Sequence, residues 1–252
     1  MSQPELLDLM AARSGIVCAV GAGGKKTVLY ALAAAHPGRI AFTTTVHTTH
    51  PPEELGFTGF VARDAELLGR AAELAAVRRA ALFGTEGKPG RHGGLEPETI
   101  TRLHALGRFE ATFVKADGAR MRWIKAPRQY EPVLPPDTRT VIGVLSARAI
   151  GEPLTDRIAH RVDLVSAVTG CAPGEIFGPE HMGRLIASPE GLGSGTGDTL
   201  FVPVLNAVDD PQREALATAA ARAALDLDPD LHRVILTCMR DAGQPVVAEV
   251  RR

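Results

Sequence analysis

The chain has 252 residues, 45% of them hydrophobic and 4% aromatic, with a formal net charge of −1 at pH 7. This length and apolar content suffice for a large α/β domain packed by aliphatic side chains, while the near-neutral charge argues against nonspecific binding to nucleic acid or to an anionic membrane. The three cysteines are far apart and form no CxxC pair, and residues 1–13 lack a basic-then-apolar leader, so we expect a cytoplasmic protein with reduced thiols and neither a signal peptide nor a membrane segment.

Strand-like and helix-like segments alternate along the chain. Strands are predicted where short apolar or β-branched runs occur, at 16–20, 39–45, 111–116, 141–145, 200–205, 231–236 and 246–250. Helices are predicted at 4–13, 25–35, 64–82, 97–106, 156–169, 180–187 and 210–225. The alternation predicts a single α/β domain over 1–252, with a mostly parallel sheet and helices on both faces, in the manner of a P-loop NTPase.

Three segments qualify this simple pattern. Residues 84–97 are rich in glycine and polar residues, which predicts a loop that serves as a mobile lid. Residues 119–138 combine prolines with basic side chains and are expected to form an irregular insertion. Pro203 lies inside a predicted strand and favours placing that strand at a sheet edge, or the proline near a strand end.

A glycine-rich turn between the first strand and the following helix is the strongest functional signal. Its residues are Gly21, Ala22, Gly23, Gly24, Lys25, Lys26 and Thr27. Glycines allow the backbone to pass close to phosphates, the lysines add positive charge, and a helix N-terminus attracts anions. We therefore expect phosphates to bind here, although a plain glycine turn at a strand–helix junction is the alternative.

The register of this loop remains open, because neither placement fits the pattern G-x-x-x-x-G-K-[ST]. With Lys25 as the phosphate lysine, the first glycine becomes Ala19 and the hydroxyl position becomes Lys26. With Lys26 in that role, Thr27 supplies the hydroxyl, but Val20 and Lys25 replace the glycines. Both lysines therefore stay candidates for phosphate binding and catalysis.

Asp117 ends a predicted strand and precedes a glycine, which is where a parallel-sheet NTPase places the carboxylate that holds Mg²⁺. We predict that Asp117 and Thr27 hold Mg²⁺.

Asn206 and Asp209 follow another strand in the order Asn206-Ala207-Val208-Asp209 and resemble the base-recognition motif N-K-x-D, with alanine replacing the lysine. We predict that they contact the base of ATP or GTP; an Asx-rich turn before a helix is the alternative.

Two further groups have weaker motifs. Hydroxyl and imidazole groups follow the second strand from Thr43 to His50, and Thr44 among them is predicted to contact the nucleotide. His47 and His50 have H-x-x-H spacing, for which we favour polar contacts over a metal. The basic stretch 120–128 either binds an anionic ligand or partner or forms a solvated loop.

Several short motifs, in order from residue 14 to 210, resemble the YqeC-type selenium-dependent molybdenum hydroxylase accessory proteins, a P-loop-containing family. The motifs are Val20-Gly21-Ala22-Gly23-Gly24-Lys25, Thr43-Thr44-Thr45-Val46-His47, Ala116-Asp117-Gly118-Ala119, Lys125-Ala126-Pro127, Glu131-Pro132-Val133-Leu134-Pro135, Val141-Ile142-Gly143-Val144, Gly151-Glu152-Pro153-Leu154, His160-Arg161 and Leu205-Asn206-Ala207-Val208-Asp209. The chain departs from the family pattern at Lys26, Lys115 and Ala207, where the family usually has threonine, an acid and a long polar residue. These departures argue against rapid hydrolysis more than against nucleotide binding.

The resemblance implies an accessory role in maturing a molybdenum hydroxylase, with that enzyme or its cofactor machinery as a partner. Together with the loop, it leads to three hypotheses. The first is a Mg²⁺-dependent ATP- or GTP-binding protein that hydrolyses the nucleotide slowly. The second is a small-molecule kinase or nucleotidyl transferase, with residues 84–97 as the lid and 120–128 holding an anionic acceptor. The third is a non-catalytic carrier of a nucleotide or cofactor.

Overall fold

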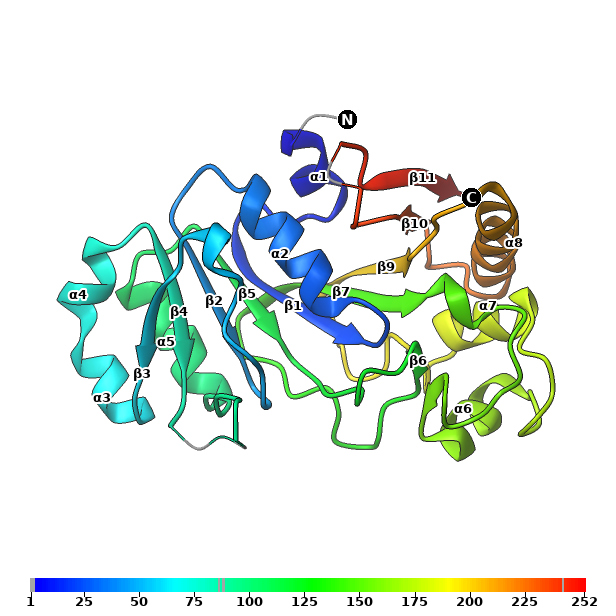
Figure 1. Ribbon diagram of the computed structural model, residues 1–252, viewed down its shortest axis with the longest axis horizontal. Helices are drawn as coiled ribbons and strands as arrows, with labels where there is room; N and C mark the ends of the chain where they lie inside the picture. Colours follow the sequence, from blue (N-terminus) through cyan, green and yellow to red (C-terminus); the bar gives the residue numbers. More distant parts are fainter. Residues whose placement is uncertain (1–2, 86, 88, 242) are drawn as a thin grey trace.

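The computed structural model describes residues 3–252 except 86, 88 and 242. Nine strands of this described part form one sheet, in the order β11-β10-β9-β7-β1-β5-β2-β4-β3 (Figure 1). The strands are β1 (Gly15–Gly21), β2 (Ile40–Thr44), β3 (Thr58–Val61), β4 (Arg79–Phe83), β5 (Ala111–Lys115), β7 (Thr138–Ser146), β9 (Leu200–Asn206), β10 (Arg233–Thr237) and β11 (Val246–Arg251). Neighbouring strands pair in parallel except at one edge, where β11 is antiparallel to β10.

Helices cover both faces of the sheet, so the predicted α/β, P-loop NTPase-like fold is confirmed. One face packs against α1 (Gln3–Leu9) and α2 (Lys25–Ala35). The helices of the other face are α3 (Asp64–Gly69), α4 (Ala71–Ala76), α5 (Pro97–Leu106), α6 (Val162–Thr169), α7 (Pro179–Ala187) and α8 (Pro211–Leu227). A two-stranded sheet of β6 (Ile124–Lys125) and β8 (Ala159–His160) lies apart from the main one.

The central strand β1 is buried on both sides, which explains its uninterrupted apolar sequence. Val17 and Ala19 face the core formed with α2, whereas Ile16, Cys18 and Val20 face the core formed with α5. On α2, Val28, Leu29 and Leu32 lie on the face that packs against the sheet. β1 and α2 therefore fix the glycine loop between them at the carboxyl edge of the sheet, between the ends of β5 and β7.

The prediction of one long helix from Asp64 to Leu82 was wrong. The segment forms two short helices, α3 and α4, and then strand β4. Residues Ala80 to Phe83 are fully buried, and β4 lies between β2 and β3. A buried parallel strand has no polar alternation, so this alanine-containing run matched a helix as well as a strand. Strand β3 was not predicted at all.

Two other predictions need correction. The helix expected at 156–169 begins only at Val162, because Ala159–His160 forms β8 and Arg161 adopts a left-handed backbone with φ 68°. The strand containing Pro203 is not an edge strand but lies between β7 and β10. Its pairing with β10 begins at Val204, after the proline, so the missing backbone donor costs no bond to β10 at that point.

The remaining predicted elements agree with the structure to within a few residues, including the antiparallel edge strand at the C-terminal end. Of residues 84–97, predicted as a lid, 86 and 88 lie outside the described residues. The rest of that segment folds back on itself through a bridge between Gly84 and Gly93, and Pro97 begins α5. Of residues 119–138, Ile124–Lys125 forms β6 and Thr138 begins β7. None of the described helices combines the length and apolar character needed to cross a membrane.

Candidate functional site

The loop between β1 and α2 follows a path that requires glycine. Gly23 and Gly24 have φ angles of 71° and 138°, in the region that side chains rarely adopt. A Cβ on Gly24 would lie 2.2 Å from the amide nitrogen of Asn206, and one on Gly23 would lie 2.5 Å from the Cβ of Ser146. The loop is therefore held tightly against the ends of β7 and β9.

Protein acceptors already use the first N–H groups of this loop. Gly21 donates to Asp117 Oδ2 at 2.9 Å, Ala22 to the carbonyl of Val144 at 2.7 Å, and Gly23 to the carbonyl of Arg122 at 3.0 Å. The next four N–H groups, of residues 24–27, begin α2, and the N–H of Val28 makes the first intrahelical bond at 3.0 Å. A phosphate would thus meet the N-terminus of an eleven-residue helix.

Lys25 points inward. Its Nζ lies 2.7 Å from Asp117 Oδ1 and donates to the carbonyl of Gly21, and only 6% of the side chain is exposed. Burial lowers the pKa of Lys25, while the nearby Asp117 carboxylate opposes this effect. The lysine of the phosphate loop is therefore held within the protein by a carboxylate from the neighbouring strand end.

Asp117 is buried and shared between two ammonium groups. Its Oδ2 accepts from Gly21 and lies 2.7 Å from Lys125 Nζ. Its Oδ1 lies 2.7 Å from Lys25 Nζ in an ion pair and has no other partner among the described residues. If Lys25 moved away, this carboxylate oxygen would suit Mg²⁺, which prefers such ligands. Among the described residues, no group of three or more His, Cys, Asp or Glu side chains could hold a metal.

The ion pairs continue away from the loop as a buried row of alternating charges: Lys25, Asp117, Lys125, Glu131 and Arg161. Lys125, 1% exposed, lies 2.7 Å from Asp117 Oδ2 and donates to Glu131 Oε2 at 2.8 Å and to the carbonyl of Gly118 at 3.1 Å. Arg161 makes two 2.7 Å bonds to the Glu131 carboxylate. Burial alone would raise the pKa of Glu131, but the bonds from Arg161 and Lys125 outweigh it and lower the pKa to about 2.

The sequence predicts Lys125 only as part of a basic stretch that could bind an anionic ligand, and Arg161 only as a weaker candidate of the same kind on a helix. It predicts no role for Glu131 and does not predict that the three residues pair. The available signal was their position in the short motifs of the family resemblance, because the acidic and basic members of three separate motifs meet in this row. Next to Arg161, burial and then the charges of Arg161, Lys125 and Arg120 lower the pKa of His160 to about 4, so His160 is neutral at pH 7.

The remaining loop residues point outward. Lys26 is partly exposed and donates to Thr49 Oγ1 at 2.8 Å, and burial followed by the charge of Arg91 lowers its pKa. Thr27, in the first turn of α2, is exposed.

Thr44, on β2, is fully buried, and its hydroxyl donates to the carbonyl of Lys115 at 2.8 Å and accepts from the N–H of Val46 at 3.1 Å. Thr44 therefore joins β2 to β5.

Asn206 and Asp209 occupy different environments. Asn206 lies behind the loop, where its amide nitrogen donates to the carbonyl of Gly23 at 3.1 Å and its oxygen accepts from Thr237 Oγ1 at 3.1 Å. Asp209 is partly exposed and pairs with Arg148 and, at 3.0 Å, with Arg213. Arg148 lowers its pKa, against a smaller opposing effect of burial. Asn206 thus positions the phosphate loop from β9.

The histidines form an aromatic group rather than a metal site. The ring of His92 stacks on Phe83, with centroids 4.6 Å apart and planes 7° apart. The His50 ring lies edge-on to both, 6.0 Å from His92 and 5.9 Å from Phe83. His47 is exposed, and its carbonyl accepts from Lys115 Nζ at 3.1 Å.

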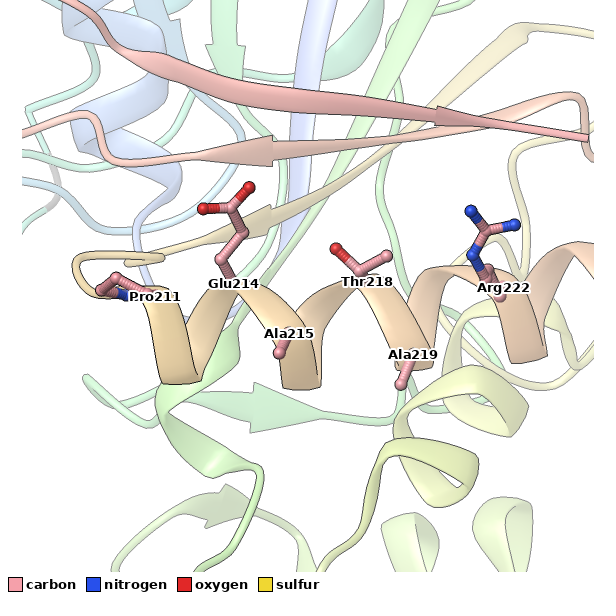
Figure 2. Close-up of a pocket in the computed structure, with 6 residues that line it drawn as sticks. All are labelled: Pro211, Glu214, Ala215, Thr218, Ala219 and Arg222. Atoms are coloured by element: carbon pink, nitrogen blue, oxygen red, sulfur yellow. The ribbon is translucent and has the colours of Figure 1, made fainter.

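A shallow groove of about 510 Å³ runs along α8, and the residues that line it all belong to that helix (Figure 2). A cavity of about 10 Å³ lies beside Gly21, Asp117 and Lys125. It has room for about one water molecule and is too small for a nucleotide.

Comparisons with known proteins show the family of the chain. Residues 17–163, more than half of the chain, match the model of the family described as "YqeC protein". The chain belongs to the YqeC family. It is also 28% identical over 182 residues to a protein of Escherichia coli (strain K12) named "Uncharacterized protein YqeC", covering 71% of this chain and 70% of that protein. The matched region contains the phosphate loop, Asp117, Lys125, Glu131 and Arg161.

Proposed function

We propose that this YqeC-family protein binds ATP or GTP together with Mg²⁺ at the β1–α2 loop. Three features together carry the proposal: a loop in which Gly23 and Gly24 cannot be replaced without strain, the N-terminus of α2, and a buried Lys25 paired with Asp117 at the end of the adjacent strand. Gly21 to Gly24 would let phosphates approach the backbone, and Lys25 or Lys26 would neutralise them.

Asp117 and Thr27 are the proposed ligands of Mg²⁺, which when bound would neutralise phosphate charge. The oxygen that supports this role is Asp117 Oδ1, which is buried and lacks a hydrogen bond within the described structure. In the free protein the ammonium of Lys25 supplies positive charge to that oxygen. Release of Lys25 towards the phosphates would therefore leave a negative charge for a cation to balance.

We propose slow rather than rapid hydrolysis. The residues so placed act by positioning and electrostatics, as in phosphoryl transfer generally. Near the proposed Mg²⁺ ligands, however, Lys26 and Lys115 stand where the family usually has a threonine and an acid, so a hydroxyl and a carboxylate that would assist hydrolysis are missing. We therefore expect nucleotide binding with slow hydrolysis. The protein would then act through the difference between its nucleotide-bound and nucleotide-free states.

The cellular role that we propose is assistance in the maturation of a molybdenum hydroxylase, with that enzyme or its cofactor machinery as partner. This role comes from the family resemblance, and the residues of the chain add only the nucleotide-dependent step. It predicts that a hydroxylase produced without this protein accumulates in an inactive form and that phosphate-loop variants fail to restore its activity.

Titration of a fluorescent ATP or GTP analogue with Mg²⁺ tests the binding, and release of labelled phosphate tests the turnover. We expect the Lys25→Ala, Lys26→Ala double variant to lose at least tenfold in affinity. Arg222→Ala is the control, because it also removes a cation, but from α8, which covers the opposite face of the sheet from α2. Equal affinities of the wild type and the double variant would overturn the proposal.

A further inference from the structure

Beside the phosphate loop, three cations approach three consecutive residues. Lys115 Nζ donates to the carbonyl of His47, and Lys26 Nζ donates to the hydroxyl of Thr49. Between them, Thr48 exchanges two backbone hydrogen bonds with His92, at 2.8 and 3.1 Å, which fixes the neighbouring Arg91 beside the same segment. Strand β5, helix α2 and the segment after β4 thus bring Lys115, Lys26 and Arg91, here called the cation cluster, to the carboxyl edge of the sheet, beside the segment that follows β2.

The cation cluster lacks anionic partners. Among residues 3–252 without 86, 88 and 242, no carboxylate forms an ion pair with Lys26, Arg91 or Lys115. Asp117 is the carboxylate whose charge acts on Lys115, but its oxygens are already shared by Lys25 and Lys125. A hydroxyl of Thr48 is also buried there without a hydrogen bond to any described residue.

The closeness of these positive charges is unfavourable in the free protein. The charges of Lys26 and Arg91 act on Lys115, and the charge of Arg91 acts on Lys26. Repulsion among like charges that are partly removed from water is unfavourable. An anion placed between them would relieve it, and such an arrangement is typical of binding sites rather than of structural charges.

We propose that Lys26, Arg91 and Lys115 form a second anion site, which binds a small molecule carrying a phosphate or similar oxyanion next to the nucleotide. The proposal deepens the proposed function and rests on it in one respect, namely that the second ligand lies beside bound nucleotide phosphates. Lys26 follows Lys25 in the first turn of α2, so one helix N-terminus would face both ligands. Ligands of open α/β sheets bind at this carboxyl edge.

The cation cluster is a better acceptor site than the basic stretch 120–128. In that stretch Lys125 is buried and held by Asp117, Glu131 and the carbonyl of Gly118, and the carbonyl of Arg122 accepts from the loop N–H of Gly23. These two residues therefore support the loop. Lys26 and Lys115 donate to neutral oxygens, and no described carboxylate forms an ion pair with either of them or with Arg91.

Calorimetric titration with inorganic phosphate tests the proposal, first on the free protein and then on protein saturated with a non-hydrolysable nucleotide and Mg²⁺. We expect Arg91→Ala, Lys115→Ala to lose at least tenfold in phosphate affinity in both states, while its nucleotide affinity stays within about twofold of the wild type. Lys25→Ala should show the converse, and Arg222→Ala should change neither.

Unchanged phosphate affinity in Arg91→Ala, Lys115→Ala would overturn the second site. So would an equal loss of nucleotide affinity in that variant, because the cluster would then belong to the nucleotide's own phosphates. The two proposals fail separately. A protein that binds no nucleotide but loses phosphate affinity in Arg91→Ala, Lys115→Ala would refute the nucleotide site and retain the anion site.

Discussion

The phosphate loop lies between two groups of charged side chains that differ in almost every physical respect. The buried row from Lys25 to Arg161 alternates in sign, is buried from Lys25 to Lys125 and partly buried at Glu131 and Arg161, and gives each charge a partner at about hydrogen-bond distance. The cation cluster of Lys26, Arg91 and Lys115 has one sign, is partly exposed and touches neutral oxygens. Both groups reach the loop through adjacent residues, Lys25 and Lys26.

The difference indicates that the two groups of charges have different roles. Paired buried charges are costly to disturb and hold a unique geometry, so the buried row positions the loop and Asp117. Neighbouring cations without anionic partners raise the free energy of the folded protein, and a bound anion lowers it. The cation cluster therefore suits the binding of an anion. The experiments below test this division from the largest expected effect to the smallest.

The largest effect is expected from Lys125→Met, which keeps the length of the stem but removes the central ammonium of the buried row. Asp117 and Glu131 would then be left with less positive charge in a buried place, and we expect the free energy of unfolding to fall by about 3–5 kcal/mol. Urea denaturation followed by circular dichroism measures it. Lys115→Met is the matched control, with an expected change below about 1 kcal/mol or a slight gain, since it relieves repulsion. Equal losses in the two variants would remove the distinction between the groups.

Gly24→Ala tests the rigidity of the loop itself. A Cβ there would meet the Asn206 amide at 2.2 Å, and that amide is held by the carbonyl of Gly23 and by Thr237. With a φ of 138° as well, we expect a cost of about 1–3 kcal/mol in stability and at least a tenfold loss of nucleotide affinity.

Gly56→Ala provides the control for Gly24→Ala. Gly56 also has a positive φ of 65°, but nothing lies within 4 Å of its added Cβ. Only the backbone strain of about 1 kcal/mol should remain, without an effect on nucleotide affinity. If Gly56→Ala weakened nucleotide binding as much as Gly24→Ala, the effect would come from general destabilisation and not from the loop.

How far the sequence predicts these features depends on whether a feature is local. The strand, glycine loop and helix around Lys25 could be predicted because neighbouring residues form them. β4 could not be separated from a helix, since a buried strand with two alanines lacks alternation. The pairing of Lys125 with Glu131 and Arg161 depends on how the irregular segment 119–138 folds over the end of β5, and Arg161 lies 30 residues beyond Glu131. The family motifs mark these residues, but no spacing in the sequence specifies that they contact one another.

The pH dependence of anion binding tests the cation cluster. With the pKa of Lys115 lowered to about 7 by burial and by Lys25, Lys26 and Arg91, the side chain is charged below pH 7 and loses its charge above it. An anion binds the charged form, so affinity should fall as pH rises from 6 to 9, by at most tenfold per pH unit. Sulfate is the suitable probe because its own charge is constant over this range. Lys115→Arg stays charged and should give a flatter profile; a profile as steep as that of the wild type would assign the titration to another group.

Asp209 allows the effect of ion pairing on stability to be distinguished from the effect of burial. It is paired with Arg148 and Arg213, as the charges of the buried row are paired, but it is partly exposed, as the cation cluster is. We expect Asp209→Asn to lower the free energy of unfolding by less than about 1 kcal/mol, because exposed ion pairs contribute little. The same variant tests the prediction that Asp209 contacts the base. If it does, the ratio of ATP to GTP affinity changes in Asp209→Asn; if the arginines alone use this carboxylate, both affinities remain within about twofold of the wild type. A loss of stability as large as that of Lys125→Met would show that pairing, and not burial, determines the cost of removing a charge in this fold.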